Sequence, residues 1–214
     1  MHLLLAFALL LQDDDLSKLV DRLAGDDADD VKAAQAELVK KGKDSKSAVQ
    51  KALGGAKKEL KGRYESVLLR IEAGVDESSA KVDGVPVNVE ADWFLETPKD
   101  DVPQGAKGKK WAHIVGRFIA TNESDSEKVL VITGATLITL KEKTKLVVEG
   151  IKEGKKVPFQ WTLPARMPKS PNYDNLIEPK WPVGTRAVIV FEIKIGDATA
   201  KLRTNVFELL DKKP

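Results

Sequence analysis

Few side chains in this sequence have the chemistry of a catalyst. The chain contains no cysteine and two histidines, His2 and His113, so it lacks a thiol nucleophile and the material for a multi-histidine metal site. A Ser-His-Asp triad would have to use His113, and no serine stands in a Gly-x-Ser-x-Gly motif. We interpret His113 as a structural or surface residue.

The sequence gives little evidence for phosphate binding or for catalysis by paired carboxylates. The glycine-rich nucleotide motifs are missing, and residues 150–156 have the wrong spacing for a phosphate loop and indicate a turn. The 33 acidic residues offer many pairs, so hydrolysis by two carboxylates stays open, although none lies in a markedly apolar stretch. We therefore expect a protein that is not an enzyme and that holds no metal and no cofactor.

The charge distribution does not favour nucleic acid. The 35 Lys and Arg residues nearly balance the 33 Asp and Glu residues, which leaves a formal net charge of +2. Small basic clusters at 107–110 and 152–156 fall in expected loops. Neither forms the concentrated positive field that binds a phosphate backbone.

The N-terminal segment has the character of a targeting signal. Leu3 to Leu11 are nine consecutive apolar residues, followed by Gln12 and three aspartates. A membrane span needs about 20 apolar residues, whereas the core of a signal peptide has about 7 to 15. We expect residues 1–12 to be a signal peptide and the protein to be periplasmic or secreted, with no membrane span. The alternative is an N-terminal helix whose apolar face is buried.

Residues 13–75 show a helical period. Leu16, Leu19, Val20 and Leu23 recur at the spacing of one helix face. Asp29 or Asp30 is expected to cap the next helix, which ends at Gly42. Two more helices are predicted, near 45–53 and 60–71.

Part of this region resembles a known repeat. The residues Val31-Lys32-Ala33-Ala34-Gln35-Ala36-Glu37-Leu38-Val39-Lys40-Lys41-Gly42, followed by Ala48-Val49 and Ala52-Leu53, are similar to a HEAT-type repeat. Lys32 stands where that family usually has arginine. The resemblance implies stacked helical hairpins and no chemistry.

Near Gly74 the hydrophobic period changes from that of a helix to that of a strand. Residues 76–84 form a polar linker in this interpretation, and apolar and polar residues alternate from Val85 to Leu95. Further β-rich stretches follow, and Gly196-Asp197 is a two-residue hairpin signal. Short strands at regular spacing predict an antiparallel sandwich over residues 85–214.

Two motifs in this half resemble bacterial immunoglobulin-like modules. They are Phe118-Ile119-Ala120-Thr121-Asn122-Glu123-Ser124-Asp125 and Trp181-Pro182-Val183-Gly184-Thr185. The predicted fold class is therefore α+β and multidomain, with short HEAT-like helical hairpins followed by an immunoglobulin-like β-sandwich. Such a fold does not choose among adhesive, inhibitory and sugar-binding roles.

The segment from Pro158 to Pro182 is unusual because it holds six of the ten prolines together with several aromatic residues. Proline restricts the unfolded chain, so a long loop here can keep one shape at a lower entropic cost. We predict a recognition loop whose contact residues are Trp161, Arg166, Tyr173 and Trp181. The alternative is a crossover connection whose aromatic residues cap the core.

These observations predict a non-enzymatic, exported module for protein interaction or scaffolding, with another protein of the cell envelope as its partner. One alternative is a carbohydrate-binding module that uses Trp161, Tyr173 and Trp181 on a polysaccharide. Another is a proteinase inhibitor that presents a rigid loop at residues 164–176. A shift of tryptophan fluorescence with polysaccharide would favour the first alternative, and loss of protease inhibition after deletion of the loop would favour the second.

Overall fold

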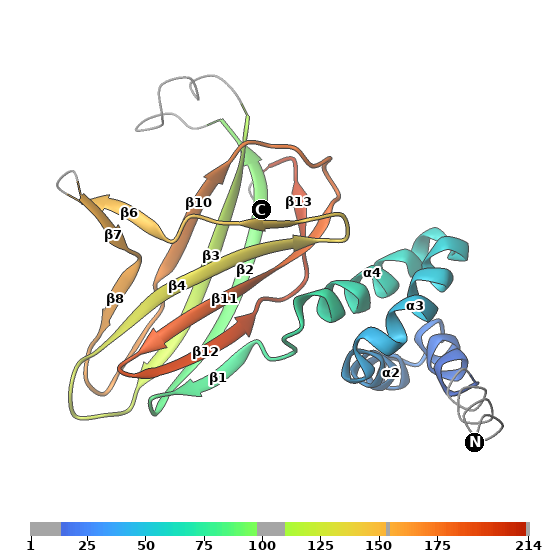
Figure 1. Cartoon of the computed structure of the whole chain (residues 1–214), viewed down its shortest axis with the longest axis horizontal. Coiled ribbons are helices and arrows are strands. Elements are labelled where there is room, and N and C mark those ends of the chain that lie inside the picture. The colour runs from blue at the N-terminus through green and yellow to red at the C-terminus, as the bar shows by residue number, and fades with distance from the viewer. Residues whose placement is uncertain (1–13, 98–109, 153–154, 213–214) are drawn as a thin grey trace, which may run out of the picture. The chain divides into compact units, whose positions relative to one another are not determined.

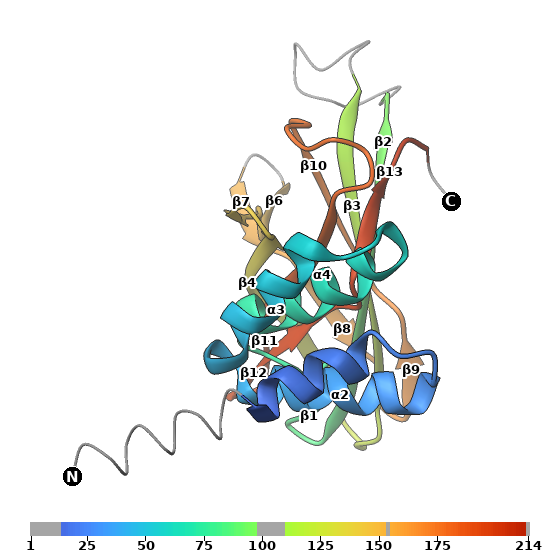
Figure 2. The same ribbon diagram turned by 90° about the vertical axis from the view of Figure 1, so that its right-hand side faces the viewer.

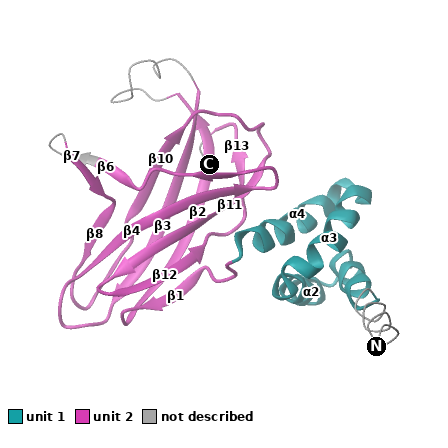
Figure 3. Ribbon diagram, viewed as in Figure 1, with its two compact units in different colours: residues 1–74 teal, residues 75–214 magenta. Residues whose placement is uncertain are grey.

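The computed structural model describes residues 14–97, 110–152 and 155–212, which fall into two compact units (Figure 3). The first unit ends at Gly74 and the second begins at Val75. We call them the helical unit and the β unit. The expected signal peptide, residues 1–12, lies outside the described residues.

The helical unit contains a helical segment at residues 14–23 and the helices α2 (Ala28–Lys41), α3 (Lys43–Gly55) and α4 (Lys58–Ala73). One apolar stripe of each helix enters a common core, in which Leu23, Leu38, Val49 and Val67 are fully buried. Since α4 packs against both α2 and α3, this core is shared by the whole unit. The prediction of stacked HEAT-like hairpins is therefore wrong, because the helices form one small bundle.

The N-cap of α2 lies two or three residues before the predicted one, which was Asp29 or Asp30. Asp27 is the N-cap, and its carboxylate accepts hydrogen bonds of 2.9 Å from the backbone N–H groups of Asp29 and Asp30. Asp29 and Asp30 occupy the first turn, where the helix dipole favours negative charge.

In its described residues, the β unit is built on a sheet of eleven strands with a separate two-stranded hairpin, β6–β7 (Figure 1). Its strands are β1 (Ser79–Val82), β2 (Val85–Glu96), β3 (Trp111–Asn122), β4 (Lys128–Thr139), β5 (Lys143–Lys145), β6 (Glu149–Lys152), β7 (Lys155–Pro158), β8 (Gln160–Leu163), β9 (Met167–Lys169), β10 (Asn172–Ile177), β11 (Arg186–Ile195), β12 (Ala198–Arg203) and β13 (Phe207–Leu210). The main path runs in the order β10-β3-β2-β13-β11-β4-β5, and β1, β8, β9 and β12 pair with strands of this path.

The expected immunoglobulin-like sandwich is wrong, because the two halves of the sheet share a strand. β13 pairs in parallel with β2, where Leu209 lies opposite Trp93, and antiparallel with β11, where Phe207 lies opposite Ala187. A sandwich would leave the two sheets without a shared hydrogen-bonded strand. The unit is instead one curled sheet with the form of a half-barrel, in which β2 and β13 lie side by side (Figure 2).

Two further segments differ from expectation. β1 occupies residues that the sequence assigns to a linker, and it forms a hairpin with β2 through a turn at Asp83 and Gly84, which both have positive φ. The segment from Pro158 to Pro182 is not one long loop, because it contains β8, β9 and β10. The hairpin predicted at Gly196-Asp197 is confirmed between β11 and β12.

Arg203, at the end of β12, fastens the first residues of the β unit. Its buried guanidinium donates to the carbonyl oxygens of Val75 and Asp76 at 3.1 and 2.9 Å. Its backbone N–H donates to the carbonyl oxygen of Glu77 at 2.8 Å. These contacts hold the chain against the sheet directly after Gly74, whose φ of 65° ends α4.

The concave side of the sheet encloses the core of the β unit. Trp93, Ile114, Phe118, Leu137 and Phe191 are among its fully buried side chains. Within the described residues, none of the helices has both the length and the apolar character that crossing a bilayer requires.

Candidate functional site

Tyr173, one of the four predicted contact residues, is fully buried in the β unit. Its hydroxyl donates to the carbonyl of Val147 at 2.7 Å and accepts from Asn175 Nδ2 at 2.9 Å. Phe159 and Phe191 pack edge-on at 5.4 and 5.2 Å. Burial raises the pKa of the phenol far above its ordinary value, which keeps the side chain neutral. Tyr173 offers no surface to a partner in this structure.

Trp181 and Trp161 also pack within or against the core of the β unit. Trp181 is 8% exposed and meets Trp93 edge-on, with 5.1 Å between the ring centroids. Trp161 is half-buried and lies between Phe118 and Phe159, at 5.9 and 6.5 Å. Both tryptophans occupy positions that match the alternative interpretation, in which the aromatic residues cap the core.

Arg166 alone of the four predicted residues is exposed. Its guanidinium pairs with the carboxylate of Asp125, and its backbone N–H donates to Ser124 at 3.2 Å. These contacts hold a non-glycine residue at a φ of 56°. The structure thus does not bring Trp161, Arg166, Tyr173 and Trp181 together on one surface.

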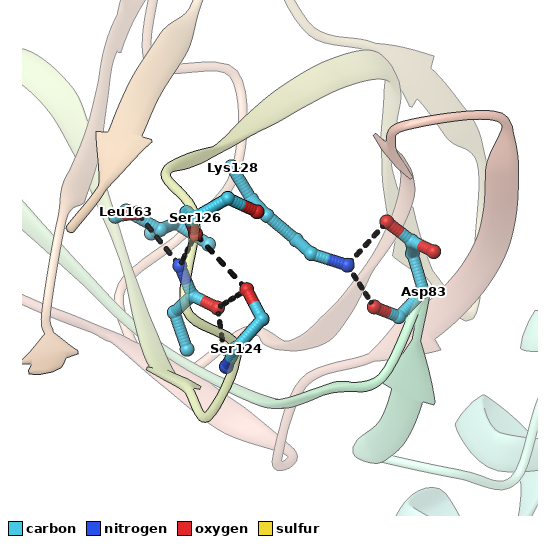
Figure 4. A network of polar contacts seen from close by, with 6 residues as sticks. Asp83, Ser124, Ser126, Lys128 and Leu163 are labelled. Carbon is cyan, nitrogen blue, oxygen red and sulfur yellow. Dashed lines mark hydrogen bonds and ion pairs between the residues drawn. The ribbon is translucent and has the colours of Figure 1, made fainter. Parts of the chain in front are cut away.

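A polar network joins three turns of the β unit (Figure 4). Asn122 is fully buried and donates to the carbonyls of Ser126 and Leu163 at 2.9 Å, while its own oxygen accepts from Ser124. Lys128 donates to the carbonyl and the carboxylate of Asp83, both at 2.6 Å.

A concavity of about 600 Å³ lies beside this network and is lined in part by Lys128, Lys194, Val129 and Val131. Within the described residues, the Ser124 hydroxyl is hydrogen-bonded to the oxygens of Asn122 and Ser126 and not to a basic group. Because Lys128 is already paired with Asp83, we assign the network to the stability of the turns.

His113 lies on β3 between two carboxylates. Its Nε2 atom is 3.0 Å from Oδ1 of Asp174 on β10, and its Nδ1 atom is 2.8 Å from Oε1 of Glu96 on β2. The second contact lacks the geometry of a hydrogen bond. Within the described residues, the polar contacts of this ring are to these two carboxylates, and no serine or threonine hydroxyl is bonded to it.

The helical unit contains a groove of about 860 Å³ between residues 16–21, α3 and the start of α4. Its apolar lining comes from Leu16, Val20, Ala48, Ala52 and Leu60. The residues that α3 contributes to this lining include Ala48, Ala52 and Gly55, all of which are small.

Charged residues of both signs line the same groove. Asp21 and Asp44 are acidic, and Lys51 and Lys57 are basic. Tyr64 also lines it, and burial, assisted by the charge of Asp21, raises the pKa of its phenol. The groove therefore combines apolar surface with charged groups that can select a partner.

Sequence reasoning missed the groove, although a signal was present. Ala48, Ala52 and Gly55 recur at intervals of four and three residues on α3, the spacing of one helix face. This pattern marks a face without large side chains, but it does not show what packs there. Across the described ranges, no three His, Asp or Glu side chains gather as metal ligands would.

The comparisons with known proteins give no family. No family profile matches the chain, and no curated protein sequence matches it. The X-ray structure of Northeast Structural Genomics Consortium target SoR45 is 9% identical, with a TM-score of 0.34 over 62% of this chain and 90% of that one. A putative lipoprotein of Bacillus subtilis is 12% identical, with a TM-score of 0.33 over 60% and 38%.

A third structure is the alkylpurine DNA glycosylase AlkC of Pseudomonas fluorescens, bound to DNA containing an abasic site analog. It is 15% identical, with a TM-score of 0.26 over 89% of this chain and 51% of that one. TM-scores this low support neither a shared fold nor a shared activity.

Proposed function

We propose that this chain is a non-enzymatic protein-binding module whose helical unit receives an amphipathic helix of a partner protein. The groove of the helical unit supports this proposal. An amphipathic helix binds by laying its apolar face in such a groove, and charges at the margin set its direction. Asp21 and Asp44, together with Lys51 and Lys57, favour a partner helix that carries both signs of charge.

A pair of matched substitutions tests the groove. Ala52→Glu puts a charged side chain on its apolar lining, whereas Ala33→Glu makes the same change at an exposed position of α2. Each variant and the unmodified full chain are immobilised, and proteins retained from a cell-envelope fraction are identified and quantified. We expect Ala52→Glu to reduce retention of a specific partner by about tenfold or more.

The control variant Ala33→Glu shows whether a loss of binding is specific to the groove or follows from an added charge anywhere on the surface. Ala33→Glu should retain the partner like the unmodified chain. Equal retention by all three proteins, with unchanged thermal stability, would rule out the groove as the binding site.

Export is part of this proposal and depends on the apolar run Leu3 to Leu11, which lies outside the described residues. Cell fractionation and the mass of the mature protein test it. An unprocessed protein found in the cytoplasm would contradict export.

The two alternative functions gain no support from the site. Among the described residues, every aromatic side chain is buried or half-buried, which leaves at most partly exposed rings for stacking on a sugar. Residues 164–176, the loop expected of an inhibitor, are largely paired with β3 through β9 and β10. Deleting them would remove two strands of the sheet, so point substitutions are the better test of any role in binding.

A further inference from the structure

β10 forms one end of the main sheet, and half of its backbone groups have no backbone partner among the described residues. The N–H of Phe118 donates to the carbonyl of Pro171 at 3.0 Å, so these two residues are a hydrogen-bonded pair of the β3–β10 ladder. This pair shows which residues of β10 bond to β3. Since bonded and non-bonded pairs alternate in an antiparallel ladder, Tyr173, Asn175 and Ile177 turn their backbone groups toward β3.

The intervening residues turn the other way. Asn172, Asp174 and Leu176 direct their N–H and C=O groups to the free edge, and they have no backbone partner there in the described part of the chain. Their side chains are exposed, on the face opposite to the core. Six polar groups are thus available to an added strand.

Other strands at the margins of the sheet carry the features that prevent such pairing. β5 is three residues long, and two of them are Lys143 and Lys145. β1 is four residues long and includes Lys81. β10 has six residues, Asn-Tyr-Asp-Asn-Leu-Ile, without lysine, proline or a bulge. Its edge therefore lacks the usual protection against an incoming strand.

The side chains along this edge indicate the chemistry of what it binds. Asp174 is 60% exposed, and Glu178 follows the strand as a second exposed acid. β10 has no basic residue, and Leu176 presents a 37% exposed apolar side chain two positions from Asp174. A complementary strand places a basic residue opposite Asp174 and an apolar residue opposite Leu176.

We propose that the free edge of β10 binds an extended, basic segment of a partner protein by β-strand addition. The backbone groups of Asn172, Asp174 and Leu176 supply the hydrogen bonds. The carboxylate of Asp174 contacts His113 through Oδ1 and is still 60% exposed, and it selects a cation. This surface belongs to the β unit, and the proposal does not depend on the groove of the helical unit.

A synthetic peptide tests the proposal on the full-length protein. The probe is acetyl-Thr-Val-Thr-Lys-Thr-Thr-amide, which in antiparallel register puts valine opposite Leu176 and lysine opposite Asp174. Amide chemical shifts and hydrogen exchange are measured by NMR during titration. We expect shifts and slowed exchange at the amides of Asp174 and Leu176.

Two control peptides separate backbone pairing from simple charge attraction. N-methylation of the valine and lysine nitrogens removes the donors but keeps the charge, and it should abolish binding. Replacing the lysine by glutamate should weaken binding by about tenfold. Equal binding of the N-methylated peptide, or protection that appears in the helical unit, would overturn strand addition at β10.

Two variants of the protein complete the test. Leu176→Pro removes an N–H that faces the free edge and so leaves the ladder to β3 intact, whereas Leu176→Val keeps that N–H. Binding should be lost in the first and retained in the second. Should Leu176→Pro fail to fold, the N-methylated peptide still decides. Failure here would leave the result for Ala52→Glu untouched, because the groove uses other residues.

Discussion

Tyr173 shows how a single buried side chain stabilises the β unit. Its ring fills the space between Phe159 and Phe191, and its hydroxyl reaches the carbonyl of Val147. Asn175 Nδ2 donates both to this hydroxyl and to the same carbonyl, at 2.9 and 3.1 Å. The pair thereby ties β10 to the chain between β5 and β6 through side chains, where no ladder joins them.

The pKa of Tyr173 has a consequence for stability at alkaline pH. Burial raises the pKa of the folded state, whereas an unfolded tyrosine ionises near pH 10. The stability that this difference contributes is present below about pH 10 and is lost as the pH rises further. Above that point, we expect the contribution of Tyr173 to the free energy of unfolding to fall by about 1.4 kcal/mol per pH unit.

Absorbance of the phenolate in a Tyr64→Phe variant measures this effect, because Tyr173 is then the only tyrosine. We expect the phenolate to appear only as the β unit unfolds. A reversible titration near pH 10 in the folded protein would contradict the burial of this group.

At the same scale, the burial of Tyr173 could not be predicted, because polarity does not indicate which residues of β10 face the core. Asn175 points into the core and Leu176 points out of it, which reverses the usual distribution of polar and apolar residues. Prolines around these residues indicated a loop, although they flank short strands. By contrast, the regular alternation from Val85 to Leu95 predicts which residues of β2 face the core, and Trp93 is buried in accordance with it.

Among the elements, the side chain of Arg203 joins the end of β12 to residues 75 and 76, beside the backbone bond to Glu77. Arg203→Ala removes the donors to Val75 and Asp76 and leaves their carbonyls without these partners. We expect faster hydrogen exchange in residues 75–80, by about tenfold or more, since the loss of such bonds to a charged donor costs about 1.5–3 kcal/mol.

Hydrogen exchange followed by mass spectrometry checks this result. Lys201→Ala is the control, because it removes only an exposed ion pair with Glu192, which contributes little. Unchanged exchange in Arg203→Ala would mean that other contacts hold residues 75–77.

Helices and long strands could be predicted from the sequence, whereas their association could not. Apolar stripes and glycine ends located the helices, and regular alternation located β2. Alternation alone does not distinguish a sandwich from a curled sheet, since both bury one face of each strand. The groove likewise depends on which helix packs beside α3, and local sequence does not contain that information.

On the scale of the β unit as a whole, β13 is the strand that makes the sheet continuous. Phe207 is 7% exposed and Leu209 is fully buried, and the backbone of β13 pairs with strands that begin at residues 85 and 186. A chain that ends at residue 205 therefore loses both the connection between the halves and two core side chains.

We expect that truncation to abolish cooperative thermal unfolding of the β unit, monitored by near-ultraviolet circular dichroism of its tryptophans. A chain that ends at residue 211 keeps β13 and should melt like the full chain. A cooperative transition in the shorter chain at the same temperature would show that β13 is dispensable.

The position of β13 also has a bearing on biosynthesis. Its neighbours β2 and β11 leave the ribosome earlier, yet they cannot be joined before residues 207–210 have been translated. Contacts so distant along the chain form slowly. We therefore expect the facing edges of β2 and β11 to stay open to other chains until β13 has been made, and open strand edges of this kind favour aggregation unless a chaperone covers them.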